Sequence, residues 1–190
     1  AITEAAFNEL DVFLKNGGGL IWFSGGIESD PVYQKYFSNL RFPIATRKIE
    51  INSGHFNVIM PTNEDHILSD LNVRKLSNEL PEVFSYVKHI PKANQKVHLE
   101  LNNGDPFLID FDRGSGKIFY FTSLLSLKWN DLTLRGLLIP LMHKLLILGG
   151  TDEISSSPIL VGDPKWITLN GNELRNEWEV QSPSGVKNLI

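Results

Sequence analysis

The sequence predicts an α/β domain built in three layers, a sheet flanked by helices, followed by the start of a second, β-rich module. Two observations support this prediction. A segment with helical spacing, a glycine turn and a four-residue apolar run follow one another over residues 2–23, which is half of an α/β repeat. From residue 159 onward, short β-type segments alternate with turn residues. We therefore expect domains at residues 1–150 and 151–190.

The composition is that of a folded chain without a nucleic-acid-binding surface. Of the 190 residues, 42% are hydrophobic and 21% are charged, which is the balance of a globular protein. The 18 basic and 22 acidic residues give a net charge of −4 without a run of Lys or Arg, so no nucleic-acid partner is expected. The chain has no Cys, which removes disulfides, thiolate metal sites and a Cys nucleophile.

The N-terminal part of the chain predicts two helices and three strands. Residues 2–14 carry apolar side chains at helical spacing, and residue 1 already lies within this helix, so we expect a domain truncated at its N-terminus. Residues 20–23 are apolar at every position, as in a strand covered on both faces. A second helix is expected at residues 31–40, and strands at residues 44–52 and 56–60.

The middle of the chain gives the clearest β pattern. Residues 63–72 are polar and rich in turn residues, with a short helix expected around residues 66–71, and residues 80–86 predict another turn of helix. Residues 97–122 then contain three β-type segments separated by two Gly-containing turns. The last of these segments, residues 118–122, is almost continuously apolar. We therefore expect a meander whose last strand is the most deeply buried.

A loop and a helix are expected to complete the first domain. Residues 124–134 predict the loop, and the helix that follows extends to Leu148, with Pro140 either in its first turn or at a kink. The apolar stretch from Leu137 to Leu148 is too short to cross a membrane. Residues 151–158 are polar and predict a linker.

Motifs that suggest cofactor or metal chemistry have simpler structural explanations. Residues 17–19 follow a helix and precede a strand, the reverse of a dinucleotide-binding loop, and residues 114–117 lack the spacing of a P-loop. No Gly-x-Ser-x-Gly elbow is present, and the five His residues, which we expect on the surface or at helix caps, lack metal-ligand spacing. Asp110 and Asp112 are expected on the solvated face of a strand. No metal or cofactor is predicted.

The most distinctive loop contains Trp129, Asp131 and Arg135. It follows a buried strand, which is where α/β sheets hold their ligands. We take these three residues as a candidate ligand-binding site and predict no catalytic residue. The alternative is structural: Trp129 covers the edge of the sheet, while Asn130 or Asp131 caps the helix.

Two segments carry a resemblance to a known family. Residues 17–26, GGGLIWFSGG, are similar to the glycine-flanked apolar strand of class I glutamine amidotransferase-like domains. Residues 101–146 combine an Asn-Gly turn, a glycine-flanked apolar strand ending in Ser, a Trp-Asn-Asp-Leu loop and a Pro-containing helix. This combination resembles the soluble region of bacterial BatA-type membrane proteins, a group linked by name to aerotolerance. The resemblance covers residues 5–150.

The resemblance implies a glutamine amidotransferase-like, flavodoxin-like fold for this domain. It also implies two transmembrane helices and a von Willebrand factor A-like region upstream, and an immunoglobulin-like module downstream. The implied location is the inner membrane, with this domain facing the periplasm. Active amidotransferases need a Cys nucleophile, which this chain lacks.

We therefore expect a non-catalytic interaction or scaffold domain from the soluble part of a membrane-anchored bacterial envelope protein. Its expected partners are other envelope proteins and a second copy of the chain, because an α/β domain cut before its first strands leaves an apolar sheet edge. The alternative function is a remnant hydrolase or amidotransferase-like site, or a small-ligand site, completed by residues outside the chain.

Overall fold

The structure, a computed structural model, describes residues 3–27, 30–59, 67, 79–150, 179–181 and 187–189. The chain separates into two compact units, Ala1–Asp152 and Glu153–Ile190. In the second unit, β9 (Glu179–Gln181) and β10 (Lys187–Leu189) pair antiparallel, and the immunoglobulin-like module stays a prediction. The linker expected at residues 151–158 lies outside the described residues.

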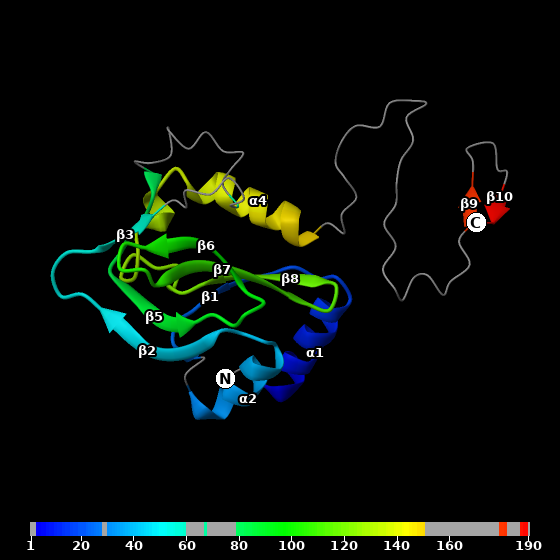
Figure 1. Ribbon diagram of the computed structural model, residues 1–190, viewed down its shortest axis with the longest axis horizontal. Coiled ribbons are helices and arrows are strands. Elements are labelled where there is room, and N and C mark those ends of the chain that lie inside the picture. Colours follow the sequence, from blue (N-terminus) through cyan, green and yellow to red (C-terminus); the bar gives the residue numbers. More distant parts are fainter. Residues whose placement is uncertain are drawn as a thin grey trace. The chain divides into compact units, whose positions relative to one another are not determined.

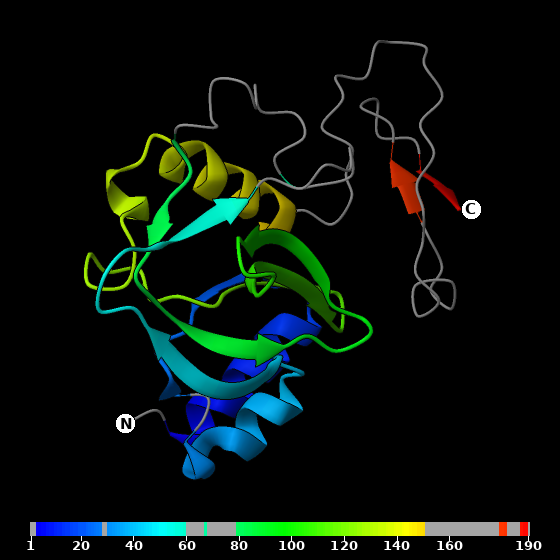
Figure 2. The ribbon, with the colours of Figure 1, turned by 60° about the vertical axis from the view of Figure 1, so that its left-hand side comes forward.

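The first unit is built around a six-stranded sheet in the order β1-β8-β7-β6-β3-β4 (Figure 1). Its strands are β1 (Leu20–Phe23), β3 (Phe56–Ile59), β4 (Glu82–Val83), β6 (Lys96–Leu101), β7 (Pro106–Arg113) and β8 (Gly116–Phe121). Strand β1 runs parallel to β8, and the other neighbouring pairs are antiparallel. A separate ribbon pairs β2 (Ile44–Glu50) with β5 (Ser85–Ile90), and Figure 2 shows it curving away from the main sheet.

Side chains cap the starts of the first two of the four helices described in this unit. The four helices are α1 (Glu4–Lys15), α2 (Pro31–Asn39), the short 3-10 helix η3 (Leu132–Leu134) and α4 (Leu138–Gly150). Thr3 Oγ1 accepts a hydrogen bond from the N–H of Ala6 at 3.3 Å, and Asp30 Oδ1 accepts one from Val32 at 2.9 Å. Pro140 lies in the first turn of α4, where its missing N–H removes no intrahelical hydrogen bond.

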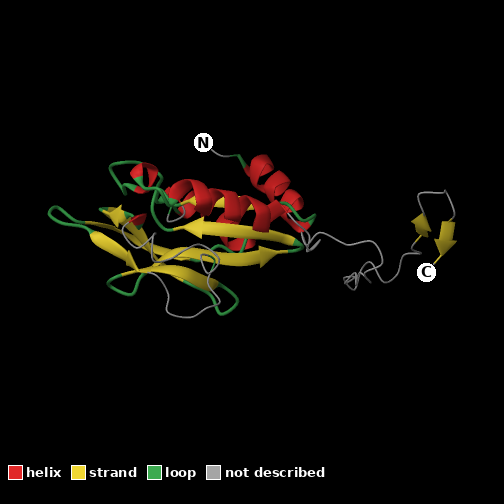
Figure 3. Cartoon of the chain, turned by 90° about the horizontal axis from the view of Figure 1, so that it is seen from above, coloured by secondary structure: helices red, strands yellow, loops and turns green. Residues whose placement is uncertain are grey.

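Helices cover both faces of the main sheet. In Figure 1, α1 and α2 lie on one side of the sheet and α4 on the other, and Figure 3 shows α4 extending along the strands. Two apolar cores result. The core on the α4 side includes Val83, Leu99, Leu101, Leu108, Phe119, Phe121, Leu141 and Leu145. The core on the side of α1 and α2 includes Phe7, Leu14, Phe37, Phe42, Ile109, Phe111, Ile118 and Tyr120.

Strand β8 contributes to both cores because its side chains alternate between the two faces. Phe119 and Phe121 point toward α4, and Ile118 and Tyr120 point toward α1 and α2. All four side chains are at most 1% exposed. The prediction of a meander with a deeply buried last strand is therefore confirmed.

The predicted three-layer, flavodoxin-like α/β fold is wrong. That fold is a mostly parallel sheet with helical crossovers between strands, whereas here β6, β7 and β8 form an antiparallel meander joined by short turns. The observed fold is a curled, mixed sheet with few helices. The prediction failed because an apolar run such as residues 20–23 indicates that both faces of a strand are covered, and says nothing about the direction of its neighbours.

Two local predictions also need correction. Residues 80–86 do not form a turn of helix: β4 and the start of β5 occupy this segment, because its apolar residues pack against the main sheet. Asp110 is not on a solvated face, since it is only 8% exposed. The short helix expected around residues 66–71 lies outside the described residues, apart from Ile67.

A buried tyrosine joins β5 to the turn between β6 and β7. The Tyr86 hydroxyl donates a hydrogen bond to Asp105 Oδ2 at 2.5 Å and accepts one from Asn103 Nδ2 at 2.8 Å. Lys88 Nζ lies 2.8 Å from the other carboxylate oxygen of Asp105. Burial and the Asp105 carboxylate raise the pKa of Tyr86 to about 12. Burial alone would raise the pKa of Asp105, but Lys88 and Tyr86 outweigh it and lower that pKa.

This cluster predicts a loss of stability in alkali. Tyr86 ionises near its ordinary pKa of 10.0 in the unfolded chain and only near about 12 in the folded chain, so its contribution is complete below pH 10.0 and is lost as the pH rises toward 12. Urea unfolding at a series of alkaline pH values should show a free energy of unfolding that falls less steeply for Tyr86→Phe than for the wild type. Equal slopes for the two proteins would contradict the assignment.

Arg41 has a backbone conformation that glycine adopts more easily. Its φ is 64°, and it directly follows α2. Its N–H donates to the carbonyl of Ser38 at 3.0 Å, and the N–H of Phe42 donates to that of Phe37 at 3.0 Å, which closes the end of the helix. The conformation places Cβ close to the following carbonyl oxygen and therefore costs energy at any residue except glycine.

Substitution of Arg41 by glycine should remove this strain. We expect Arg41→Gly to raise the free energy of unfolding by roughly 0.5–1 kcal/mol, after the greater freedom of glycine in the unfolded chain is deducted. Chemical denaturation measures the difference. Arg41→Lys keeps the strain and should match the wild type, so the strain is absent if Arg41→Gly is no more stable than Arg41→Lys.

Candidate functional site

The loop after β8 is held against β4 and β5 by its backbone. The N–H groups of Phe84 and Ser85 donate to the carbonyl of Trp129 at 2.7 and 3.0 Å. Asp131 N–H donates to the Glu82 carbonyl at 3.1 Å, and Glu82 N–H donates to Asp131 Oδ1 at 2.7 Å. The shape of the loop that carries the three candidate residues is therefore fixed by the sheet.

Asn130 fixes the same loop from inside the protein. It is 1% exposed, and its Nδ2 donates to Ser123 Oγ and to the carbonyl of Leu124, both at 2.8 Å. Its Oδ1 accepts a hydrogen bond at 3.1 Å from the N–H of Leu132, the first residue of η3. Asn130 thus holds the start of η3, whose N-cap position is Asp131, and the Asp131 side chain makes no capping hydrogen bond there.

Asp131 and Arg135 lie together, as a ligand site would require, but they bind each other. Arg135 Nε donates to Asp131 Oδ2 at 2.8 Å, and Nη2 of the same guanidinium contacts that oxygen as well. Nη2 also lies 3.1 Å from Glu82 Oε1. The hydrogen bonds that Arg135 donates to Asp131, with a smaller contribution from Glu82, raise the pKa of Arg135. His55 Nδ1 lies 3.4 Å from the other Glu82 oxygen and extends the cluster.

Trp129 contacts a different part of the fold. Its side chain is half-buried, and Lys48 Nζ of β2 lies 4.9 Å from the centre of its ring. The structure therefore joins Asp131 and Arg135 to β4, and the Trp129 ring to β2.

The chemistry available at this site is limited by these contacts. Asp131 Oδ1 is bound to Glu82 N–H and Oδ2 to the Arg135 guanidinium, so a ligand would have to displace an existing partner from either oxygen. Within the described residues, no three His, Asp or Glu side chains gather in a way that could hold a metal ion. The arrangement is that of an ion-pair network that connects a loop to a strand.

A buried polar cluster lies elsewhere, on the sheet. His98 of β6 and Asp110 of β7 are 6% and 8% exposed, and His98 Nε2 lies 3.1 Å from Asp110 Oδ1. Neither ring nitrogen of His98 has a partner in hydrogen-bonding geometry, so its contact with Asp110 is an electrostatic one. Lys117 Nζ is 3.2 Å from Asp110 Oδ2. Burial alone would raise the pKa of Asp110, but His98 and Lys117 outweigh it and lower that pKa.

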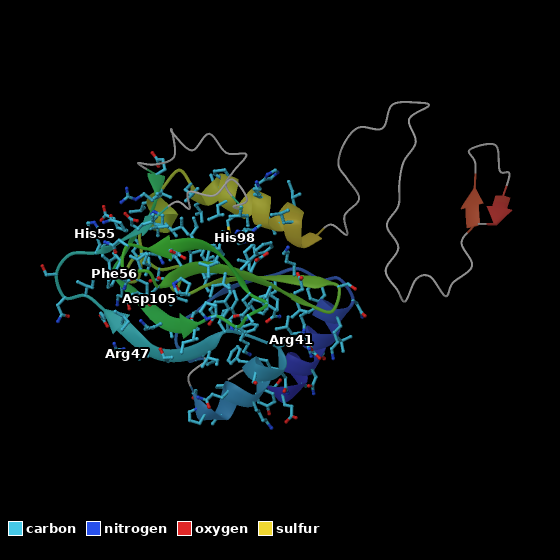
Figure 4. The ribbon with its side chains drawn as sticks, in the orientation of Figure 1. Arg41, Arg47, His55, Phe56, His98 and Asp105 are labelled. Atoms are coloured by element: carbon cyan, nitrogen blue, oxygen red, sulfur yellow. The ribbon has the colours of Figure 1, made fainter. Side chains whose placement is uncertain are left out.

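Two of the His residues expected on the surface or at helix caps are therefore buried. His98 lies at an irregularity in the β6–β7 register, which no sequence pattern reveals, and Figure 4 shows it on the sheet. His89 of β5 is 3% exposed: its Nδ1 lies 2.7 Å from the Val87 carbonyl and its Nε2 2.8 Å from the Tyr120 hydroxyl. Both are interior residues of the sheet region.

Comparisons with known proteins give similar folds only. No protein-family model and no curated protein matches the sequence. Among solved structures, the cytoplasmic protein STM3548 from Salmonella typhimurium aligns with a TM-score of 0.63 and 21% identity, over 78% of this chain and 62% of that one. The cytoplasmic protein STM1381 from Salmonella typhimurium LT2 aligns with a TM-score of 0.53 and 24% identity, over 67% of this chain and 53% of that one. The β-galactosidase from Bacillus circulans sp. alkalophilus aligns with a TM-score of 0.56 and 19% identity, over 77% of this chain and 21% of that one.

These similarities extend to the fold and no further. The chain spans less than two thirds of each of these three proteins, and identities below 25% carry no information on activity. The shared architecture is the curled, mixed sheet, in agreement with the correction of the three-layer prediction. The resemblance to BatA-type proteins stays a prediction.

Two predictions about the membrane are contradicted. One is the inner-membrane location with the domain facing the periplasm, and the other is the membrane-anchored, double-transmembrane character of the protein. Both Salmonella proteins with a similar fold are named as cytoplasmic. In the described part of the chain, no helix is both long and apolar enough to cross a bilayer. The prediction came from the family resemblance alone, because the residues themselves provided no membrane span.

The ion-pair network predicts a structural role for Asp131. We expect Asp131→Ala to lower the free energy of unfolding by about 2 kcal/mol, because it leaves the Glu82 N–H and the Arg135 guanidinium without their acceptor. Asp131→Asn should cost less, since the amide oxygen still accepts from Glu82. The matched control is Asp112→Ala, which removes an exposed carboxylate from β7. Urea denaturation measures the free energy of unfolding of each variant. An Asp131→Ala variant as stable as the wild type would contradict the structural role.

Proposed function

We propose that the chain is a non-catalytic interaction domain that binds a second copy of itself through the outer face of α4. The observation that supports the proposal is the exposed apolar surface of this helix. Among its large side chains only His143 and Lys144 are polar, so α4 is apolar on nearly every side. A helix of this kind is normally buried all round, yet the sheet covers only the face that carries Leu141 and Leu145.

The uncovered residues of α4 follow helical spacing. Ile139 is 79% exposed, Leu146 66% and Ile147 46%. Positions 139, 143, 146 and 147 recur at intervals of three and four residues, so they share one face of the helix. This repeat is typical of a helix that packs against another helix. His143, at the centre of this face, is the only polar residue among these four positions.

The C-terminal end of α4 lies beside the outermost strand of the sheet. Gly19, which precedes β1, is so close to Gly149 that a Cβ on Gly19 would lie 2.4 Å from the Gly149 carbonyl oxygen. Strand β1 is the last strand at that edge among the described residues. The end of the helix and the edge strand therefore adjoin.

A second copy of the chain suits this surface. In a symmetric dimer the same patch faces itself, so one short apolar face can supply both halves of the interface. Two antiparallel α4 helices would place Ile139 of one copy near Leu146 of the other. The non-catalytic part of the proposal draws support from the Asp131–Arg135 pair, whose polar atoms are occupied within the fold, and from the lack of Cys.

Charged substitutions on α4 should separate the dimer. We expect the wild type to sediment as a dimer at tens of micromolar, and Ile139→Glu and Leu146→Glu each to weaken dimerisation by about tenfold or more, because each buries a carboxylate in an apolar contact. Sedimentation equilibrium measures the dissociation constant.

The matched control is Val32→Glu, on α2. Val32 is 67% exposed, and α2 lies on the opposite side of the sheet from α4. This variant should dimerise like the wild type. A wild-type protein that remains monomeric at these concentrations contradicts the proposal, and so does a dimer that survives both substitutions on α4.

A further inference from the structure

A hollow of about 230 Å³ lies between α2 and the start of β2, on the side of the sheet opposite α4. Phe37, Phe42 and Pro43 provide an apolar floor, and all three are buried. Polar groups of Gln34 and Ser38, both on α2, and the ammonium-bearing side chain of Lys92 complete the lining. A concave apolar surface with a few polar groups is the usual form of a small-molecule site.

Lys92 lines this hollow, and the positive charge of Arg41 lies near it. Lys92 is partly buried, and among the described residues neither Lys92 nor Arg41 forms an ion pair. Burial, and then the nearby positive charge of Arg41, lower the pKa of Lys92. The charged form of Lys92 is therefore held at a cost.

The fold keeps the two residues together. Gln95 Oε1 accepts a hydrogen bond from the Lys92 N–H at 2.8 Å, while Gln95 Nε2 donates to the Arg41 carbonyl at 2.7 Å. One side chain thus ties the backbones of both residues across two loops. Arg41 itself retains the strained positive φ described above, and Figure 4 shows it beside α2. The C-terminal end of α2 offsets part of the repulsion through its partial negative charge.

The strained backbone of Arg41, its positive charge near Lys92 and the partly buried Lys92 ammonium occur in one place. This combination is typical of a binding site rather than of a stabilising contact. An anion placed between the charges would remove the repulsion, and the apolar floor would favour a ligand with a hydrocarbon part.

We propose that this hollow binds a small organic carboxylate, with the carboxylate on Lys92 near Arg41 and the apolar part over Phe37 and Phe42. The chain has a net charge of −4, so this local positive charge also opposes the overall field of the protein. Because the hollow and α4 lie on opposite sides of the sheet, the proposal is independent of self-association.

Benzoate is a suitable probe of this hollow. Its binding can be followed by two-dimensional NMR of the ¹⁵N-labelled protein. We expect saturable shifts of the amide signals around residues 34–45 and 92–95. Benzamide keeps the ring and removes the charge, and inorganic phosphate keeps a negative charge and removes the ring. Each should bind about tenfold more weakly than benzoate, because each loses one of the two contributions.

Two lysine variants test the assigned charge. Lys92→Met keeps the length of the side chain and should weaken benzoate binding by about tenfold. Its fold is checked in the same spectra, and its thermal stability should equal or exceed that of the wild type, since a partly buried charge is removed. Lys35→Met, on the same helix α2 but outside the lining of the hollow, should bind benzoate like the wild type.

Three results would overturn the proposal. The first is the absence of saturable shifts with benzoate. The second is equal affinity for benzoate and benzamide, or tighter binding of phosphate than of benzoate. The third is a folded Lys92→Met variant that binds benzoate as tightly as Lys35→Met does.

Discussion

The structure of the first unit depends on the burial of β8 on both faces. Its four aromatic and aliphatic side chains at positions 118–121 alternate between the α4 side and the side of α1 and α2, and the strand pairs with β1 on one edge and β7 on the other. Neither core is complete without it. The loop that follows β8 is consequently held in place, and it carries Trp129 and the Asp131–Arg135 pair to β4.

The two sides of the sheet differ in what they leave available. On one side, α4 is packed by its inner face and presents Ile139 and Leu146 outward. On the other side, α2 ends in a strained Arg41 next to a hollow with a partly buried Lys92. In both places the local energy is unfavourable in the isolated chain: exposed apolar surface in one, proximity of like charges in the other. Each is relieved by a partner of the corresponding chemistry, an apolar helix or an organic anion.

The sequence predicted the elements of this fold better than their arrangement. Alternating residues at 97–122 identify the meander, and apolar residues at helical spacing identify α1 and α2, because these signals are local. The direction of β1 and the pairing of β5 with β2 depend on contacts between distant segments, which a pattern in one segment does not contain. At the candidate site, Asp131 and Arg135 are four residues apart in one loop, so the sequence predicts them together. The sequence does not predict Glu82 at this site, because the fold alone brings it to Arg135, and it does not predict the burial of His98 or the position of Lys92 in a hollow.

The interaction of α4 with a second copy can be tested most directly by disulfide formation, because the chain contains no Cys. His143 lies at the middle of the exposed face, so in an antiparallel pair two copies of it face each other across the two-fold axis. Under mild oxidation His143→Cys should form a disulfide-linked dimer rapidly and nearly completely, while Val32→Cys on α2 should form little. Equal and slow crosslinking of the two variants would contradict an interface at α4.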